Sequence, residues 1–207
     1  LRILDELSYK YDKDSAKPSI VGINLGHIIK KFPIENDYVV MCPTNSHVGN
    51  QNHRGYRSWP DNNWKDLINR VLSETSLNIL LVGAKNEEKY FNTFYPLQER
   101  IYDLSGQTTI PELITIMENS KCVVATDSGS SHIAGAAAKN IIAIHGPTNF
   151  HQSAPYSTKY NNVKVATLNL KCSPCSDTDV IKNCKKNICM QDLSSEMVMS
   201  LITDLSL

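Results

Sequence analysis

The stretch that decides the fold reads Cys122-Val123-Val124-Ala125-Thr126-Asp127-Ser128-Gly129-Ser130-Ser131-His132-Ile133-Ala134-Gly135-Ala136-Ala137-Ala138. Its first residues are apolar and β-prone, and turn-forming residues then cluster at 126–129. Small helix formers follow up to Asn140, where we expect the helix to end, and a second apolar run covers 141–144. This order of strand, tight polar turn, helix and strand is typical of a βαβ unit.

The start of the predicted helix has the chemistry of an anion site. We expect the helix to begin near 130–132, where its first backbone N–H groups have no partners within the helix. Gly129 lets a ligand approach the backbone closely. Polar side chains beside it belong to Ser128, Ser130, Ser131 and His132. The stretch therefore predicts a phosphate site, and the alternative is that Asp127 or Ser128 only caps the helix while His132 is an ordinary helix residue.

The rest of the chain repeats this alternation of strands and helices. Apolar runs predict strands at 37–43, 78–83, 100–106 and 163–168, and periodic apolar residues predict helices between them and near the C-terminus. Helix caps are predicted at Asp61 or Asn62, at Thr108 or Thr109, and at Asp192 or Ser194. The pattern predicts an α/β fold, a doubly wound, Rossmann-like parallel sheet.

We divide the chain into two parts. Residues 1–35 are expected to be a linker with edge elements, including a short amphipathic helix at 1–11 and a strand at 19–25. Residues 36–207 are expected to form the Rossmann-like domain. The chain begins with Leu1 rather than Met, which we interpret as the start of a fragment.

Composition narrows the classes of function. The chain has 207 residues, of which 41% are hydrophobic, as in ordinary soluble globular proteins. Its formal net charge of zero argues against a nucleic-acid partner held by a basic surface. No apolar run approaches the roughly 20 residues that a transmembrane helix needs, and no signal peptide is recognisable. We therefore expect a cytoplasmic protein without a transmembrane segment.

In doubly wound folds, ligands bind outside the carboxyl ends of the strands. At that edge we expect Thr44, Asn45, Ser46, Arg57, Glu87, Thr108, Asp127, His132, Gly146 and Thr148. Arg57 lies in a loop that enters a helix, so it is either a phosphate ligand or a surface charge. Glu87 or Glu88 follows a strand, so it either accepts hydrogen bonds from ribose hydroxyls or belongs to the acidic first turn of a helix.

The cysteines suggest a second kind of site. Four of the six cluster late in the chain, at Cys172, Cys175, Cys184 and Cys189. A C-x-x-C pair followed by a second close pair is typical of a four-thiolate structural site for zinc or iron. Reduced structural thiols and a disulfide are the alternatives.

Several motifs occur in a characteristic order: Arg57-Ser58-Trp59-Pro60, Leu81-Val82-Gly83, Leu104-Ser105-Gly106, Asp127-Ser128-Gly129-Ser130-Ser131-His132 and Gly146-Pro147-Thr148. This order resembles glycosyltransferase family 9, the heptosyltransferases of lipopolysaccharide assembly, over about residues 37–207. The resemblance implies the C-terminal, nucleotide-sugar-binding half of a two-domain GT-B enzyme. It implies inverting transfer of a sugar, heptose, from a nucleotide-diphosphate sugar such as ADP-heptose to a lipopolysaccharide-type acceptor, with no cofactor.

The resemblance also implies roles for single residues. Arg57, Asp127 and His132 fall at catalytic positions, and Arg57 stands where the family commonly has a lysine that contacts the donor. Glu87 matches a carboxylate on the ribose, and Thr108 matches a residue near the base. The remaining substrate-binding positions are Thr44, Asn45, Ser46, Ser128, Gly129, Ser130, Gly146 and Thr148. There are two departures: Ser130 replaces the usual proline, and an arginine fork replaces the point charge of lysine.

In the family, an N-terminal domain binds the acceptor and carries the proposed general base. Residues 1–35 are too short to form that domain, so we expect a donor half that transfers little sugar alone, at the inner face of the cytoplasmic membrane. Two alternatives stay open. One is a non-catalytic module that binds a nucleotide sugar or a phosphoprotein, and the other is a cysteine-rich scaffold with a vestigial Rossmann-like part.

Overall fold

A single parallel sheet organises the protein in the computed structural model, which describes residues 20–34, 37–45, 55–87, 99–176 and 178–205. The strand order is β3-β2-β1-β4-β5-β6, and every neighbouring pair is parallel. The strands are β1 (Tyr38–Cys42), β2 (Asn78–Leu81), β3 (Ile101–Asp103), β4 (Cys122–Thr126), β5 (Asn140–Ile144) and β6 (Asn162–Ala166). The predicted doubly wound sheet is confirmed, in the order found in dinucleotide-binding folds.

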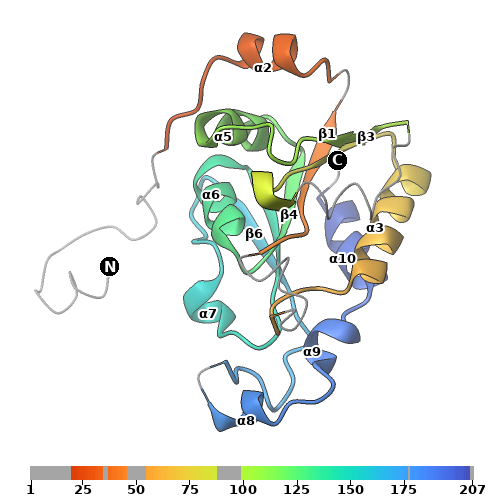
Figure 1. The fold of residues 1–207 in the computed structure, drawn as a ribbon, viewed down its shortest axis with the longest axis vertical. Coiled ribbons are helices and arrows are strands. Elements are labelled where there is room, and N and C mark those ends of the chain that lie inside the picture. Colours follow the sequence, from red (N-terminus) through yellow and green to blue (C-terminus); the bar gives the residue numbers. More distant parts are fainter. Residues whose placement is uncertain (1–19, 35–36, 46–54, 88–98, 177, 206–207) are drawn as a thin grey trace, which may run out of the picture.

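Helices cover both faces of the sheet (Figure 1). One face packs against α3 (Asp61–Glu74) and α10 (Ser195–Thr203). The other packs against α2 (Leu25–Lys31), α5 (Ile110–Glu118) and α6 (Gly129–Ala137). Successive strand residues point to opposite faces of the sheet, and each face has its own hydrophobic core. In β1, Val39 and Met41 pack in the core beneath α3 and α10, whereas Val40 and Cys42 pack in the core on the other face. The central strands are therefore buried on both sides, which explains their continuous apolar runs.

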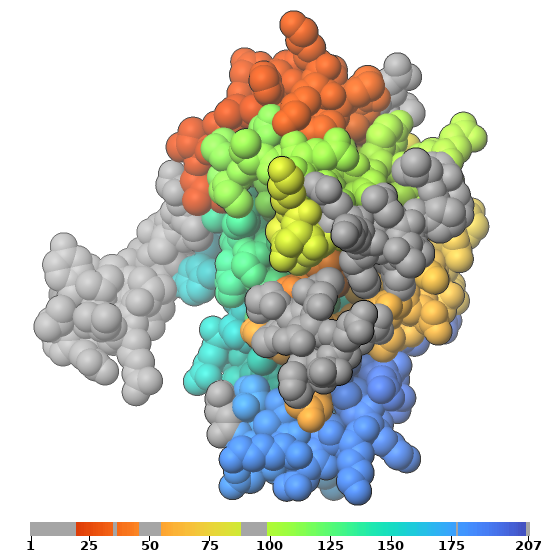
Figure 2. Space-filling view, viewed as in Figure 1, coloured from red at the N-terminus to blue at the C-terminus, as the bar shows by residue number. Residues whose placement is uncertain are grey.

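Short elements complete the described part of the chain. They are η2 (Lys85–Glu87), α7 (Phe150–Ser153), α8 (Asp179–Lys182) and α9 (Ile188–Gln191). The segment 171–191 carries α8 and α9 and forms a lobe at the lower end of the molecule in the view of Figure 2. We call it the cysteine lobe. None of the helices in the described ranges has the length and apolar character needed to span a membrane.

The strand predicted at 19–25 is wrong for the residues that the structure describes. Residues 20–24 form no strand, and α2 begins at Leu25 with Asn24 as its N-cap. The backbone of Ile23 pairs with a side chain instead, because Thr115 Oγ1 accepts from Ile23 N at 2.7 Å and donates to Ile23 O at 2.9 Å. The helix predicted at 1–11 lies outside the described residues.

The predicted helix ends are partly confirmed. Thr109 and Ser194 are N-caps, as expected, with side chains that accept from Glu112 N and Met197 N. The cap predicted at Asp61 or Asn62 is wrong, because Pro60 holds the N-cap position and α3 already begins at Asp61. Proline is tolerated at this position because it lacks only a backbone N–H, and the N–H groups at the start of a helix have no acceptor within the helix. Asn140 belongs to β5 rather than to the end of α6, which stops at Ala137.

Candidate functional site

The strand order reverses between β1 and β4, which are neighbours at the centre of the sheet. Such a reversal opens a crevice at the carboxyl ends of the strands, because the following helices leave on opposite sides. A cavity of about 570 Å³ lies there. Its walls come from Thr44 and Asn45 after β1, Gly83, Ala84 and Glu87 after β2, Thr108 to Ile110 at α5, and Ser128 to Ser130 at α6. Of the five sequence motifs, the cavity joins those at 81–83 and 127–132.

The first turn of α6 faces this cavity without a side-chain cap. Ser128 holds the N-cap position, yet its side chain makes no capping hydrogen bond. Its carbonyl accepts from Ser131 N at 3.2 Å and from Ser131 Oγ at 2.7 Å. Gly129 is exposed, and a Cβ there would meet nothing within 4 Å. The space beside these helical N–H groups is open, so an anion can reach them.

Buried polar atoms without partners gather at the same place. Within the described residues, such side-chain atoms are Trp64 Nε1, Thr126 Oγ1, Asp127 Oδ2, Ser128 Oγ and His145 Nε2. All except the tryptophan nitrogen belong to the carboxyl ends of β4 and β5. Each unpaired buried polar group costs about 1–3 kcal/mol, so a concentration of them indicates a place that a polar ligand or ordered water completes.

Arg57 supplies a positive side chain to this region. Its NH1 lies 3.6 Å from Asp127 Oδ2, and its side chain is 35% exposed, whereas that of Asp127 is 6% exposed. The pair balances its own charge beside the anion site. A carboxylate repels a phosphate, so Asp127 is suited to accept hydrogen bonds from sugar hydroxyls, while the guanidinium fork suits phosphate oxygens.

Glu87 is held rigidly in the cavity wall. Its Oε2 accepts from Thr44 Oγ1 at 2.7 Å and from Ala84 N at 2.7 Å, and the residue is 9% exposed. The hydroxyl proton of Thr44 is thereby committed to this carboxylate. Asn45 Nδ2 donates to Ser58 Oγ at 2.9 Å, and Ser46 lies outside the described residues.

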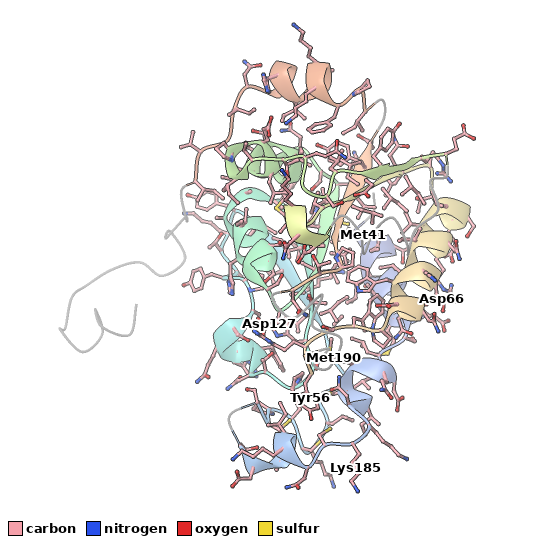
Figure 3. All side chains as sticks on the ribbon, in the orientation of Figure 1. Met41, Tyr56, Asp66, Asp127, Lys185 and Met190 are labelled. Atoms are coloured by element: carbon pink, nitrogen blue, oxygen red, sulfur yellow. The ribbon has the colours of Figure 1, made fainter. Side chains whose placement is uncertain are left out.

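Other predicted site residues lie apart from the cavity wall. Arg57, Asp127, His132, Gly146 and Thr148 do not line it. Gly146 is enclosed by the cysteine lobe, because a Cβ there would stand 2.4 Å from Met190 Sδ and 3.0 Å from Cys189 Sγ. Figure 3 shows Asp127 and Met190 in the same central part of the molecule, and Lys185 at its lower end. Ser130 contacts the buried Cys42 thiol, whose pKa burial raises to about 12 while this hydrogen bond lowers it.

His145 lies beside the predicted site residues, and the sequence reasoning did not single it out. It is 1% exposed, and its Nδ1 lies 3.2 Å from Thr148 Oγ1. Burial lowers its pKa; the Asp127 carboxylate opposes this effect and the His132 ring adds to it. The residue therefore belongs electrostatically to the α6 site. Its position directly after an apolar strand, at the edge where ligands bind, was the signal available in the sequence.

The late cysteines are free thiols. Cys172 is exposed, Cys184 is half-buried, and Cys175 and Cys189 are buried. The pKa of Cys189 is raised to about 11, first by burial and then by the other three thiols of the group. The thiols thus lie near one another, but in the described ranges no three His, Cys, Asp or Glu side chains are placed to hold a metal ion.

Comparison with known proteins identifies the family. The model of glycosyltransferase family 9 (heptosyltransferase) matches residues 6–185. Lipooligosaccharide heptosyltransferase 2 of Campylobacter jejuni subsp. jejuni serotype O:6 (strain 81116 / NCTC 11828) is 33% identical over 138 residues, or 63% of this chain and 42% of that protein. The chain therefore spans less than half the length of this relative.

Solved structures share the fold. E. coli heptosyltransferase WaaC with ADP aligns with a TM-score of 0.66 at 19% identity, over 98% of this chain and 53% of that one. The iron-containing dodecameric glycosyltransferase TibC from enterotoxigenic E. coli H10407 aligns with a TM-score of 0.62 at 14% identity, over 84% of this chain and 47% of that one. The family match, which covers most of the sequence, shows that the chain belongs to glycosyltransferase family 9, the heptosyltransferases.

Proposed function

We propose that this chain is the donor-binding part of a heptosyltransferase and binds a nucleotide-diphosphate sugar, ADP-heptose, with its diphosphate at the first turn of α6. One observation carries the proposal: an uncapped helix start, beside buried polar atoms that make no hydrogen bond within the described residues, opens on the cavity at the strand-order reversal. Helix N–H groups and the positive end of the helix dipole favour phosphate there. The WaaC structure, which shares the fold, holds ADP.

The nucleoside is placed in the cavity beyond α6. A volume of about 570 Å³ lies in the usual range for small-molecule sites. Glu87 is positioned to accept from ribose hydroxyls, since Thr44 and Ala84 already fix its orientation. Thr108 lines the far wall, where the base would lie.

In the transfer step, an acceptor hydroxyl attacks the anomeric carbon, the bond from that carbon to the diphosphate breaks, and the configuration inverts. The leaving diphosphate gains charge, which the α6 N–H groups and Arg57 stabilise electrostatically. Asp127 and His132 contact the sugar in this proposal, as hydrogen-bonding groups at the same edge. No metal takes part in the step.

The acceptor is a saccharide-linked lipid of the lipopolysaccharide type, bound by a second domain that carries the general base. This proposal follows from the lipooligosaccharide heptosyltransferase relative, of which the chain covers 42%. The reaction is placed in the cytoplasm, at the inner face of the cytoplasmic membrane. We expect the chain alone to transfer little sugar, and joining it to an acceptor domain to restore transfer.

The cysteine lobe is proposed to hold a structural zinc or iron ion. In the described part of the cysteine lobe, the buried residues are Cys175, Cys189 and Met190. The last two pack into the core that α3 and α10 share with the sheet, so the lobe has almost no apolar core of its own. Small units of this kind depend on metals or disulfides, and TibC, which shares the fold, contains iron. The thiols would have to move closer together on binding. Elemental analysis of protein purified without added metal tests this, and an ion-free folded protein would end the idea.

A thermal-shift panel tests the donor assignment. ADP at a hundredfold excess over its dissociation constant adds about 2.7 kcal/mol to stability, or roughly 5–10 °C in Tm for a chain of this size. We expect ADP and ADP-sugars to raise Tm more than UDP and GDP do. Adenosine is the control, because it lacks the diphosphate. Equal, negligible shifts with all nucleotides would contradict the proposal.

A further inference from the structure

His145 is a buried histidine to which the proposed roles assign no task. It follows β5 directly, and its backbone N–H donates to the carbonyl of Ala166 on β6 at 3.0 Å. The sheet therefore fixes its main chain, and its side chain is 1% exposed. A histidine at such a place lowers the stability of the folded protein, because an unpaired ring nitrogen loses its hydration without gaining a hydrogen bond. An apolar residue would pack there at lower cost.

Its surroundings are polar, and they include Asp127 and His132, which the proposed function places at the sugar. Nδ1 lies 3.2 Å from Thr148 Oγ1, and Nε2 is buried with no partner among the described residues. Asp127, at the end of β4, and His132, on α6, both act on the ring electrostatically. Asp127 Oδ2 is itself buried without a hydrogen bond and lies 3.6 Å from Arg57 NH1. His145 thus connects the loop after β5 with the charged pair beside α6.

We propose that His145 is a positioning residue for the donor diphosphate, which acts by fixing the hydroxyl of Thr148 and by sharing a buried polar cluster with Asp127. The inference rests on the proposed function, because it needs the diphosphate at the first turn of α6. It also needs the hydroxyl of Thr148, a predicted substrate-binding residue, to reach that diphosphate. Because the imidazole already holds the Thr148 hydroxyl, this side chain loses little rotamer freedom when the ligand binds. A hydrogen bond from Thr148 to the ligand therefore adds more to the affinity. His145 itself need not touch the ligand.

The cluster predicts proton uptake on binding. Burial lowers the pKa of His145, the Asp127 carboxylate opposes this effect, and the His132 ring adds to it, so the free ring is neutral at neutral pH. A bound diphosphate adds negative charge near Asp127 and favours the protonated ring. The affinity for ADP should therefore rise as the pH falls towards the ordinary pKa of histidine.

Calorimetric titration of the whole chain with ADP and with adenosine tests the inference. The variants are His145→Phe, Thr148→Val and their combination, and His145→Asn keeps a polar atom near the position of Nδ1. His151→Phe is the matched control, because His151 is an exposed histidine on α7 outside the cluster. Titrations at pH 7 in two buffers of different ionisation enthalpy count the protons taken up.

We expect His145→Phe to weaken ADP binding about tenfold, to leave adenosine binding within twofold, and to reduce proton uptake. Thr148→Val should have a similar effect, the double variant should be no worse than either single one, and His145→Asn should recover part of the loss. Unchanged ADP affinity in His145→Phe, an equal loss for adenosine, or additive losses in the double variant would overturn the inference alone. A wild-type chain that does not bind ADP would overturn the proposed function as well.

Discussion

Two helices, α5 and α6, begin at the same cavity and pack against each other, but their first turns differ. The start of α5 is closed by its own chain: Thr109 accepts from Glu112 N, and the Glu112 carboxylate accepts from Thr109 N at 2.7 Å. Lys31 Nζ of α2 adds a bond of 2.8 Å to the same carboxylate. The start of α6 has none of this, since Ser128 makes no side-chain cap.

In the proposed function, this difference separates a helix start that is part of the structure only from one that binds the donor. At α5, a carboxylate of the protein already occupies the place that an anion would take. At α6, the same kind of place is left open, beside an exposed glycine and unpaired buried oxygens. Local rules of helix capping are kept where the fold needs them and broken where a ligand is expected.

Closing α6 in the manner of α5 should have the largest effect. Ser128→Asp places a carboxylate where it can cap the first turn, and we expect ADP affinity to fall about 100-fold, since the N–H groups are occupied and the charge repels phosphate. Stability should rise by about 0.5–2 kcal/mol. Calorimetry and urea unfolding measure the two quantities, with Ser128→Ala as the control. If the aspartate and alanine variants bind ADP equally, the first turn of α6 is not the diphosphate site.

Removing the positive charge of Arg57 beside α6 should have the second-largest effect. Arg57→Ala should weaken ADP binding about tenfold, because one charge-assisted contact to phosphate is lost. Arg57→Lys should retain part of it, since the charge stays but the fork is lost. Adenosine titration serves as the internal control. Unchanged ADP affinity in Arg57→Ala would remove this residue from the site.

Opening α5 should affect stability and not binding. Glu112→Ala deletes the carboxylate that bonds Thr109 N and Lys31, so the free energy of unfolding should fall by about 1–2 kcal/mol. The ADP affinity of the folded protein should stay within twofold, because Glu112 does not line the cavity. Should ADP binding collapse while the fold persists, α5 would have to share the ligand.

The smallest effect is a dependence on pH. The pKa of Glu112 is lowered from 4.5 to about 2, first by the hydrogen bond from Lys31 and then by that from the Thr109 backbone. A carboxyl with a folded pKa below its unfolded value stabilises the protein above the unfolded value, and this contribution fades as pH falls from about 4.5 to about 2. Urea unfolding between pH 7 and pH 2.5 should show the wild type approaching Glu112→Ala. If the difference in unfolding free energy between the wild type and Glu112→Ala stayed constant over this pH range, the lowered pKa of Glu112 would not be its cause.

The sheet could be predicted from the sequence because each central strand is a short apolar run that ends at a turn signal, as at Thr126 to Gly129. Local spacing also limited two caps to Thr108 or Thr109 and to Asp192 or Ser194, and the structure selects Thr109 and Ser194. The proposed role of His145 could not be found this way. Its position after β5 indicates the edge where ligands bind, but its burial and its electrostatic partners arise only when β4, β5 and α6 meet. The failed strand at 19–25 has the same cause: Ile23 bonds to Thr115, which is far away in the sequence.

The contact between Gly146 and the cysteine lobe limits how the family can be recombined. Any side chain at position 146 would occupy the space of Met190 and Cys189, and the carbonyl of Pro147 accepts from Cys175 N at 2.8 Å and from Ser176 N at 3.0 Å. The loop that leads to Thr148 therefore packs against residues from much later in the chain. A chimera that exchanges the cysteine lobe between relatives must carry its matching 146–148 loop with it, or the loop after β5 will shift.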